Sequence, residues 1–142
     1  MTAITTSTAP APSYAFSPGI RIDGVHSILQ VSGQGPIDPT NGLYQHPGDV
    51  TAQTLLTLAN VQAVLQAGGA TFADVIGVRV YLTDRAHFGE MNDAYAQFMQ
   101  TALGEHPPPA RTTVMVGLPH QDMLVEIDAL AALTHPSPVD AS

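Results

Sequence analysis

The sequence predicts an α+β fold, in which a mixed β-sheet carries both of its helices on one face. Two stretches, residues 50–67 and a second from Phe88 to near Gly104, repeat apolar side chains at the three- and four-residue spacing of a helix. Between them, residues 75–83 alternate apolar and polar side chains with the period of a strand. The expected order is therefore strand, strand, helix, strand, helix, strand, strand.

The first part of the chain is expected to supply two strands. Residues 14–22 predict the first, bent at residues 17–19 because proline cannot donate to a β-ladder and glycine tolerates a bulge. A hairpin turn signal at residues 23–24 leads into a second strand over residues 27–32. The following loop, residues 33–48, is long for a compact domain, which is typical of a functional or covered loop.

The two helices are defined by their apolar stripes. The first helix carries no charge and is closed by a glycine pair at residues 68–69. Asp84 is expected to cap the second helix. The stripes are Val50, Thr54, Leu58, Val61 and Leu65 on the first helix and Phe88, Met91, Tyr95, Phe98 and Ala102 on the second. We interpret the second stripe as core and not as a cofactor site.

The last two strands hold the charges of greatest interest. Residues 112–116 predict one strand, and residues 124–133 are expected to be its partner. Side chains alternate along a strand, so Glu126 and Asp128 share one face of the second. If that face meets Arg111, two acids and an arginine converge. A structural ion pair and a functional site are both open interpretations of this group.

Length and composition predict one folded domain with tails. The chain has 142 residues and no composition break, which favours a single domain over residues 13–133. Residues 1–12 and 134–142 are rich in small, polar and proline residues, and we expect both to be mobile tails. Only 11% of the residues are charged, whereas 44% are hydrophobic. This imbalance indicates that a partner covers part of the surface, most simply in an oligomer.

Charge and residue types exclude several classes of chemistry. The formal net charge is −8, with twelve acids against four arginines, so binding to a nucleic acid backbone is disfavoured. The absence of lysine excludes a lysine Schiff base, and the absence of cysteine excludes thiolate chemistry. The six histidines form no metal-binding spacing, and no glycine-rich phosphate loop is present. We therefore expect no metal, cofactor or nucleotide, and a cytoplasmic protein without a membrane span.

Separated motifs carry a family resemblance over residues 14–133. They are Ala110-Arg111-Thr112, Leu118-Pro119 and Leu124 to Ala131 near the C-terminus, Val31 to Gln34 on an early strand, Gln53-Thr54 and Asn60-Val61 on the first helix, and Asn92, Tyr95 and Phe98 on the second. Together they resemble the RidA (YjgF) family of reactive intermediate deaminases. The resemblance implies a chorismate mutase-like fold and a homotrimer with clefts between subunits.

The resemblance also implies an activity. The family hydrolyses enamines and imines that carry a carboxylate, such as 2-iminobutanoate, to 2-oxo acids and ammonia. Arg111 occupies the position of the carboxylate-binding arginine, and its planar fork suits that group. Glu126 matches the glutamate that orients water and accepts a proton. The chain is thus expected to be a 2-iminobutanoate/2-iminopropanoate deaminase-like hydrolase.

Five further residues match positions around the family's substrate. Ser32 and Gly33 match pocket residues, although the serine is also interpretable as a strand-end turn hydroxyl. Tyr14 matches an aromatic that closes the pocket, with a core tyrosine as the alternative. Asn92 matches a cleft asparagine, with a helix-surface amide as the alternative. Thr113 stands where a cysteine is common, so only its location is carried over.

Two departures from the family pattern border the expected cleft. Phe16 is expected to make it more apolar, and Gly35 to make it roomier. Both favour a pathway-specific enzyme that acts on a larger imine or an aminomuconate-like acid. A third alternative is a trimer that binds a small ligand without catalysis. The RNA cleavage sometimes attributed to the family is disfavoured by the acidic balance and the absence of lysine.

Overall fold

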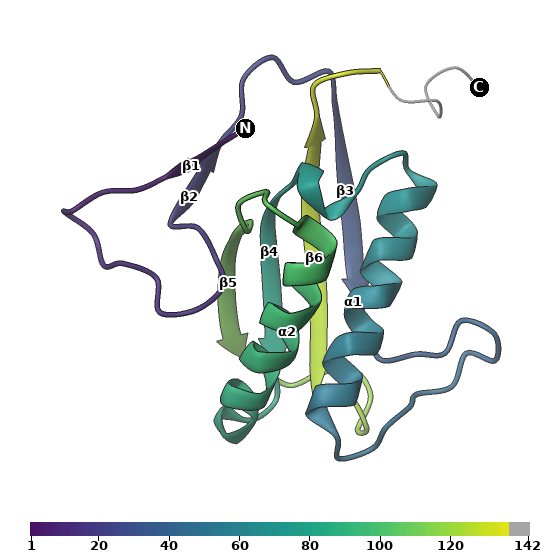
Figure 1. The fold of residues 1–142 in the computed structure, drawn as a ribbon. Coiled ribbons are helices and arrows are strands. Elements are labelled where there is room, and N and C mark those ends of the chain that lie inside the picture. The colour runs from purple at the N-terminus through teal and green to yellow at the C-terminus, as the bar shows by residue number, and fades with distance from the viewer. Residues whose placement is uncertain (137–142) are drawn as a thin grey trace.

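A four-stranded mixed sheet with two helices on one face forms the body of the molecule (Figure 1). The computed structural model describes residues 1–136, so the end of the predicted C-terminal tail lies outside the described residues. The elements are β1 (Thr2–Ile4), β2 (Gly19–Arg21), β3 (Ser27–Gln34), α1 (Val50–Ala67), β4 (Val75–Leu82), α2 (Phe88–Leu103), β5 (Ala110–Met115) and β6 (Val125–Leu133), with 3-10 turns at Phe72–Asp74 and Arg85–His87. The predicted α+β class is confirmed.

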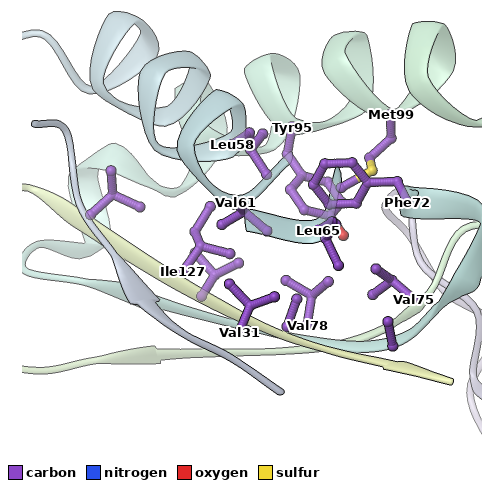
Figure 2. Packing of buried hydrophobic residues seen from close by; sticks show 14 of the residues in the cluster. Val31, Leu58, Val61, Leu65, Phe72, Val75, Val78, Tyr95, Met99 and Ile127 are labelled. Atoms are coloured by element: carbon purple, nitrogen blue, oxygen red, sulfur yellow. The ribbon is translucent and has the colours of Figure 1, made fainter. Parts of the chain in front are cut away.

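The core lies between the helices and the sheet (Figure 2). Figure 2 shows Leu58, Val61 and Leu65 of α1 pointing toward Val31 and Ile127 of the sheet, and these five side chains are completely buried. Packing against the sheet removes the apolar stripe of each helix from water, and this burial stabilises both helices in place. Within residues 1–136, neither helix is long and apolar enough to cross a membrane.

The strand order corrects one prediction. The sheet runs β3-β6-β4-β5, so β4 separates the two C-terminal strands that we expected to pair with each other. Instead, β5 pairs parallel to β4 through the α2 crossover, while β6 pairs antiparallel with both β3 and β4. The prediction was wrong because the α2 crossover places β5 beside β4, so that β6 pairs on the other edge of β4 and not with its sequence neighbour.

The N-terminal segment is more ordered than expected. Residues 2–4 were placed in a mobile tail, but they form β1, which pairs antiparallel with β2 in a separate ribbon beside the sheet (Figure 1). The expected first strand over residues 14–22 is reduced to β2 and one isolated parallel bridge from Ser17 to Ala110. Proline 18 explains the interruption, since it cannot donate to a continuous ladder.

The second face of the sheet is open in the single chain. Ile28 is 68% exposed and Val114 is 40% exposed on this face. Between them, Arg79 donates from Nε to both carboxylate oxygens of Asp128 at 3.0 and 3.1 Å, and the Tyr81 hydroxyl donates to the same carboxylate at 2.9 Å. The open face thus combines exposed apolar side chains with one satisfied polar network.

Candidate active site

Arg111 lies at the edge strand β5, and its side chain points to the helix side of the sheet. It pairs with Val78, which is buried in the core, and paired residues of neighbouring strands share a face. Its guanidinium carbon lies 4.8 Å from the ring centroid of Tyr95 on α2 and 5.4 Å from that of Phe16. Aromatic rings so placed favour a cation and restrict its orientation.

Asn92 is the third residue, after Tyr95 and Phe16, that holds the guanidinium of Arg111. Its Oδ1 accepts a hydrogen bond of 2.5 Å from Nη2 of Arg111, while its own amide nitrogen donates to the carbonyl of Phe88 at 2.8 Å. The second bond fixes the orientation of the amide: its nitrogen must face the Phe88 carbonyl, which leaves its oxygen facing the arginine. Asn92 is 5% exposed, so the alternative of a helix-surface amide is wrong.

The charge of Arg111 has no counter-ion in the described chain. Within residues 1–136, no carboxylate lies within ion-pair distance of its guanidinium, and Asp128 is paired with Arg79 instead. Burial lowers the pKa of Arg111, and the nearby Tyr95 and Tyr14 partly oppose this change. A guanidinium remains charged under such conditions. The alternative interpretation, an ion pair of Arg111 with Glu126 or Asp128, therefore does not hold within one chain.

The N-terminal segment places aromatic side chains beside this arginine. Ser17 anchors the segment, since its hydroxyl donates to the carbonyl of Pro108 at 2.5 Å and its N–H to that of Pro109 at 3.2 Å. Tyr14 packs edge-on against Phe88 with 5.2 Å between ring centroids. Tyr14 is 47% exposed, so it is not a core tyrosine. The anchoring role of Ser17 was not anticipated, because its register depends on a long-range bridge.

Glu126 lies on the open face of β6, paired with Tyr81. A β-bulge in β3 places Gly33 directly beside it: a Cβ atom at Gly33 would lie 2.7 Å from Oε2 of the glutamate. Only glycine leaves room for this carboxylate against the strand backbone. Glu126 makes no hydrogen bond or ion pair with any of residues 1–136. Ser32 is exposed in the same bulge, and its hydroxyl has no described partner.

The structure thus separates the predicted residues into two groups. Arg111, Asn92, Phe16 and Tyr14 gather on the helix side of the β5 edge. Gly33, Ser32 and Glu126 gather on the open face, where β3 meets β6. Because β4 lies between β5 and β6, and the two groups occupy opposite faces, one chain does not bring Arg111 and Glu126 together.

Two other residues differ from the sequence-based interpretation. The hydroxyl of Thr113, on the same strand face as Arg111, is buried without a hydrogen-bond partner. Gly35 does not enlarge a cleft, because it is buried and a Cβ atom there would lie 2.8 Å from the Cε methyl of Met123. Met123 therefore occupies the space that the glycine leaves. Tyr95, predicted as a core residue and as part of a family motif, is also a wall of the arginine site.

Comparison with known proteins identifies the family. Residues 6–133 match the family model described as Endoribonuclease L-PSP. The chain belongs to the YjgF/RidA family. A RutC family protein of Pyrococcus horikoshii is 40% identical over 128 residues, which cover 90% of this chain and 94% of that protein. The family resemblance predicted from separated motifs is therefore confirmed.

Solved YjgF/RidA structures share the whole fold. TdcF of E. coli, whose crystal structure contains bound serine, is 32% identical with a TM-score of 0.69, covering 94% of this chain and 99% of that one. The Rid family protein YyfB of Yersinia pestis is 29% identical with a TM-score of 0.78, covering 93% and 98%. Both helices on one face of a mixed sheet are thus the family arrangement.

Proposed function

We propose that this YjgF/RidA protein is a hydrolase that deaminates enamines and imines carrying a carboxylate, giving a 2-oxo acid and ammonia. The observation that carries the proposal is the state of Arg111. Its cation is held between two aromatic rings and by one buried amide, yet the described chain offers it no anion. A site built around an unpaired guanidinium favours a carboxylate ligand, since the fork can make parallel charge-assisted bonds to it.

The proposed reaction needs a second carboxylate near a water molecule. An enamine first takes a proton on carbon to become the imine, and water then adds to the imine carbon. A C–O bond forms as Glu126 accepts a proton from the water, and Glu126 then passes that proton to the imine nitrogen, which becomes an amine. Glu126 then moves the hydroxyl proton of the tetrahedral intermediate to the amine, so the C–N bond breaks, ammonia leaves and the 2-oxo acid remains. Glu126 suits the role because its carboxylate has no other partner in the described chain.

A complete site requires more than one subunit. Arg111 and Glu126 lie on opposite faces of one sheet, so a ligand held by the arginine needs the glutamate of a neighbouring copy. The open face of the sheet, with Ile28 and Val114 exposed, supplies apolar surface for such an assembly. We therefore infer the homotrimer expected from the family, with a cleft between subunits that joins the two groups.

A larger imine is the favoured substrate variant. Phe16 supplies an apolar wall beside Arg111, and both residues border a hollow of about 490 Å³ that extends to Arg79 and Asp128 on the open face. An apolar wall beside the carboxylate site favours substrates with an apolar side chain. Serine bound to TdcF is a small carboxylate, which supports a ligand of this class in the family. A net charge of −8 opposes RNA as the substrate.

Mixing two inactive variants tests the proposal. Arg111→Ala and Glu126→Gln should each abolish most imine hydrolysis, whereas subunit exchange between them should restore activity. In randomly mixed trimers, about a quarter of the clefts receive an intact arginine from one subunit and an intact glutamate from the next. Imine made in situ by an amino acid oxidase, in competition with semicarbazide, provides the assay. No restoration despite proven exchange would contradict the shared site, and an active Glu126→Gln variant would leave a ligand-binding trimer as the function.

A further inference from the structure

The buried amide of Gln53 on α1 links two loops that lie far apart in the sequence. Its Nε2 donates to the carbonyls of Gln45 at 3.3 Å, His46 at 3.1 Å and Asp122 at 2.8 Å, and its Oε1 accepts from the N–H of Leu124 at 2.8 Å. Gln53 is fully buried. One side chain therefore fixes both the loop that follows β3 and the loop that precedes β6.

Asn60 performs a related task on the same helix. It lies seven residues further along α1, on the same helix face, and is half-buried. Its Nδ2 donates to the carbonyl of Gly35 at 3.0 Å and to that of Ile37 at 2.9 Å. The two loops also touch each other, since the Tyr44 and His120 rings stack with 3.9 Å between centroids. The two side-chain amides of α1 therefore hold the loop after β3 and the loop before β6 in contact with the helix.

Both held loops lead directly to the open-face half of the site. Leu124, fixed by Gln53, stands two residues before Glu126. Gly35, fixed by Asn60, stands two residues after Gly33, which contacts the glutamate side chain. Neither amide touches the arginine group on α2 and β5.

We propose that Gln53 and Asn60 are positioning residues for the carboxylate of Glu126. The inference rests on the proposed role of this glutamate as the proton acceptor. Glu126 has no hydrogen bond of its own in the described chain, so its position depends on the two strand backbones and on the contact with Gly33. A reacting group whose own contacts are few depends on the rigidity of the backbone that carries it. The uncharged amides on α1 provide that rigidity at both strands.

Asn60→Ala and Asn60→Asp give the direct test, since water can replace a half-buried side chain and folding should survive. Both variants lose the N–H donors, and the aspartate keeps the shape. We expect kcat for imine hydrolysis to fall roughly 10- to 100-fold in both, as small displacements of reacting groups do. The Kd for 2-oxobutanoate, measured by calorimetry, should stay within about twofold because the arginine group is untouched.

A matched control is Thr54→Val on the same helix. Thr54 is fully buried, and its hydroxyl bonds only to the carbonyl of Val50 within the helix. This variant perturbs α1 without releasing either loop, so kcat and Kd should both be unchanged. Gln53→Met, which keeps the volume of the side chain, should behave like the Asn60 variants if it assembles. If it fails to assemble, the Asn60 pair decides the question.

The outcomes distinguish positioning from the proposed chemistry. A selective loss of kcat in the Asn60 variants supports positioning. The double variant with Gly33→Ala should then lose less kcat than the product of the two single losses, because both changes displace the same carboxylate. Parental kcat in both Asn60 variants, with Glu126→Gln inactive, overturns the positioning role alone. Equal losses of kcat, affinity and trimer stability also overturn it in favour of a purely structural role. Full activity of Glu126→Gln overturns the proposed function and this inference together.

Discussion

The arginine group and the glutamate group are built in different ways. Arg111 is enclosed within its own chain, since Tyr95 and Phe16 lie against its guanidinium and Asn92 accepts a hydrogen bond from it. Glu126 lies on the open sheet face beside Gly33 and Tyr81, and it makes no hydrogen bond or ion pair with residues 1–136. The first group is complete in one chain, whereas the second is incomplete.

This difference indicates that the arginine group binds the ligand and the glutamate group takes part in proton transfer. A ligand-binding group profits from being rigid before the ligand arrives, because less ordering remains to be done on binding. A proton acceptor needs a free lone pair beside water, which a fully hydrogen-bonded carboxylate would not have. Changes in the arginine group should therefore alter affinity, and changes in the glutamate group should alter turnover. The following predictions test that separation.

Glu126→Gln is expected to have the largest effect. The amide keeps the shape of the side chain but takes no proton from water, so kcat should fall by roughly 10²-fold or more. Affinity for 2-oxobutanoate and the melting temperature should stay near the parent values. Glu105→Gln, which removes an exposed acid elsewhere, is the control and should be fully active. Parental turnover in Glu126→Gln would mean that the glutamate is structural.

Gly33→Ala should reproduce part of that loss by displacing the same carboxylate. The added methyl group would stand 2.7 Å from Oε2 of Glu126, which is too close, so the side chain must move. We expect kcat to fall by roughly 10- to 100-fold, with little change in ligand affinity. Gly117→Ala is the control, because a Cβ atom there meets nothing within 4 Å. A crystal structure with an undisplaced glutamate would rule out this mechanism.

Arg111→Lys tests the opposite half. The lysine keeps the charge but loses the fork and the bond to Asn92, so binding of 2-oxobutanoate should weaken by roughly 10-fold or more. Because no acid in the described chain pairs with Arg111, the melting temperature should change little. Arg21→Lys, at an exposed pair with Asp23, serves as the control. A large loss of stability with no effect on affinity would make Arg111 a structural residue.

Thr113→Val should produce the smallest effect. Its hydroxyl is buried on the face shared with Arg111 and has no partner, so a ligand or water can supply one. Loss of one such hydrogen bond should weaken 2-oxobutanoate binding by about fivefold. Thr57→Val is the matched control, since that buried hydroxyl on α1 also lacks a partner but lies away from the arginine. Equal affinities in the two variants would remove Thr113 from the site.

The periodicity of the sequence predicted the helices well, but it did not predict which strands pair with each other. The helix over residues 50–67 agrees with α1 at both ends, because an uninterrupted apolar stripe and a glycine pair define it locally. The pairing of β5 with β4 depends on a crossover, and no pattern within either strand encodes that choice. For the same reason the sequence left the ion pair of Arg111 with Glu126 open, since the faces of these two residues follow from their register with β4.

Single residues of the site were predictable by position but not by contact. The family motifs indicated Asn92, although only the structure shows that its amide is oriented by Phe88 and faces Arg111. Gly35 suggested extra space in the sequence. Met123, far along the chain, fills that space, and a side chain from a distant loop leaves no local signal at the glycine.

The central place of β6 in the sheet has a consequence for how the protein is made. β6 lies between β3 and β4, so a growing chain has both of these strands available well before the strand that joins them. Pairing of Gln30 with Leu130 spans almost the whole domain, and contacts of such long sequence separation form slowly. Until translation has passed Leu133, the edges of β3 and β4 have no lateral partner from β6. Nascent chains should therefore depend on holdase chaperones until their last strand emerges.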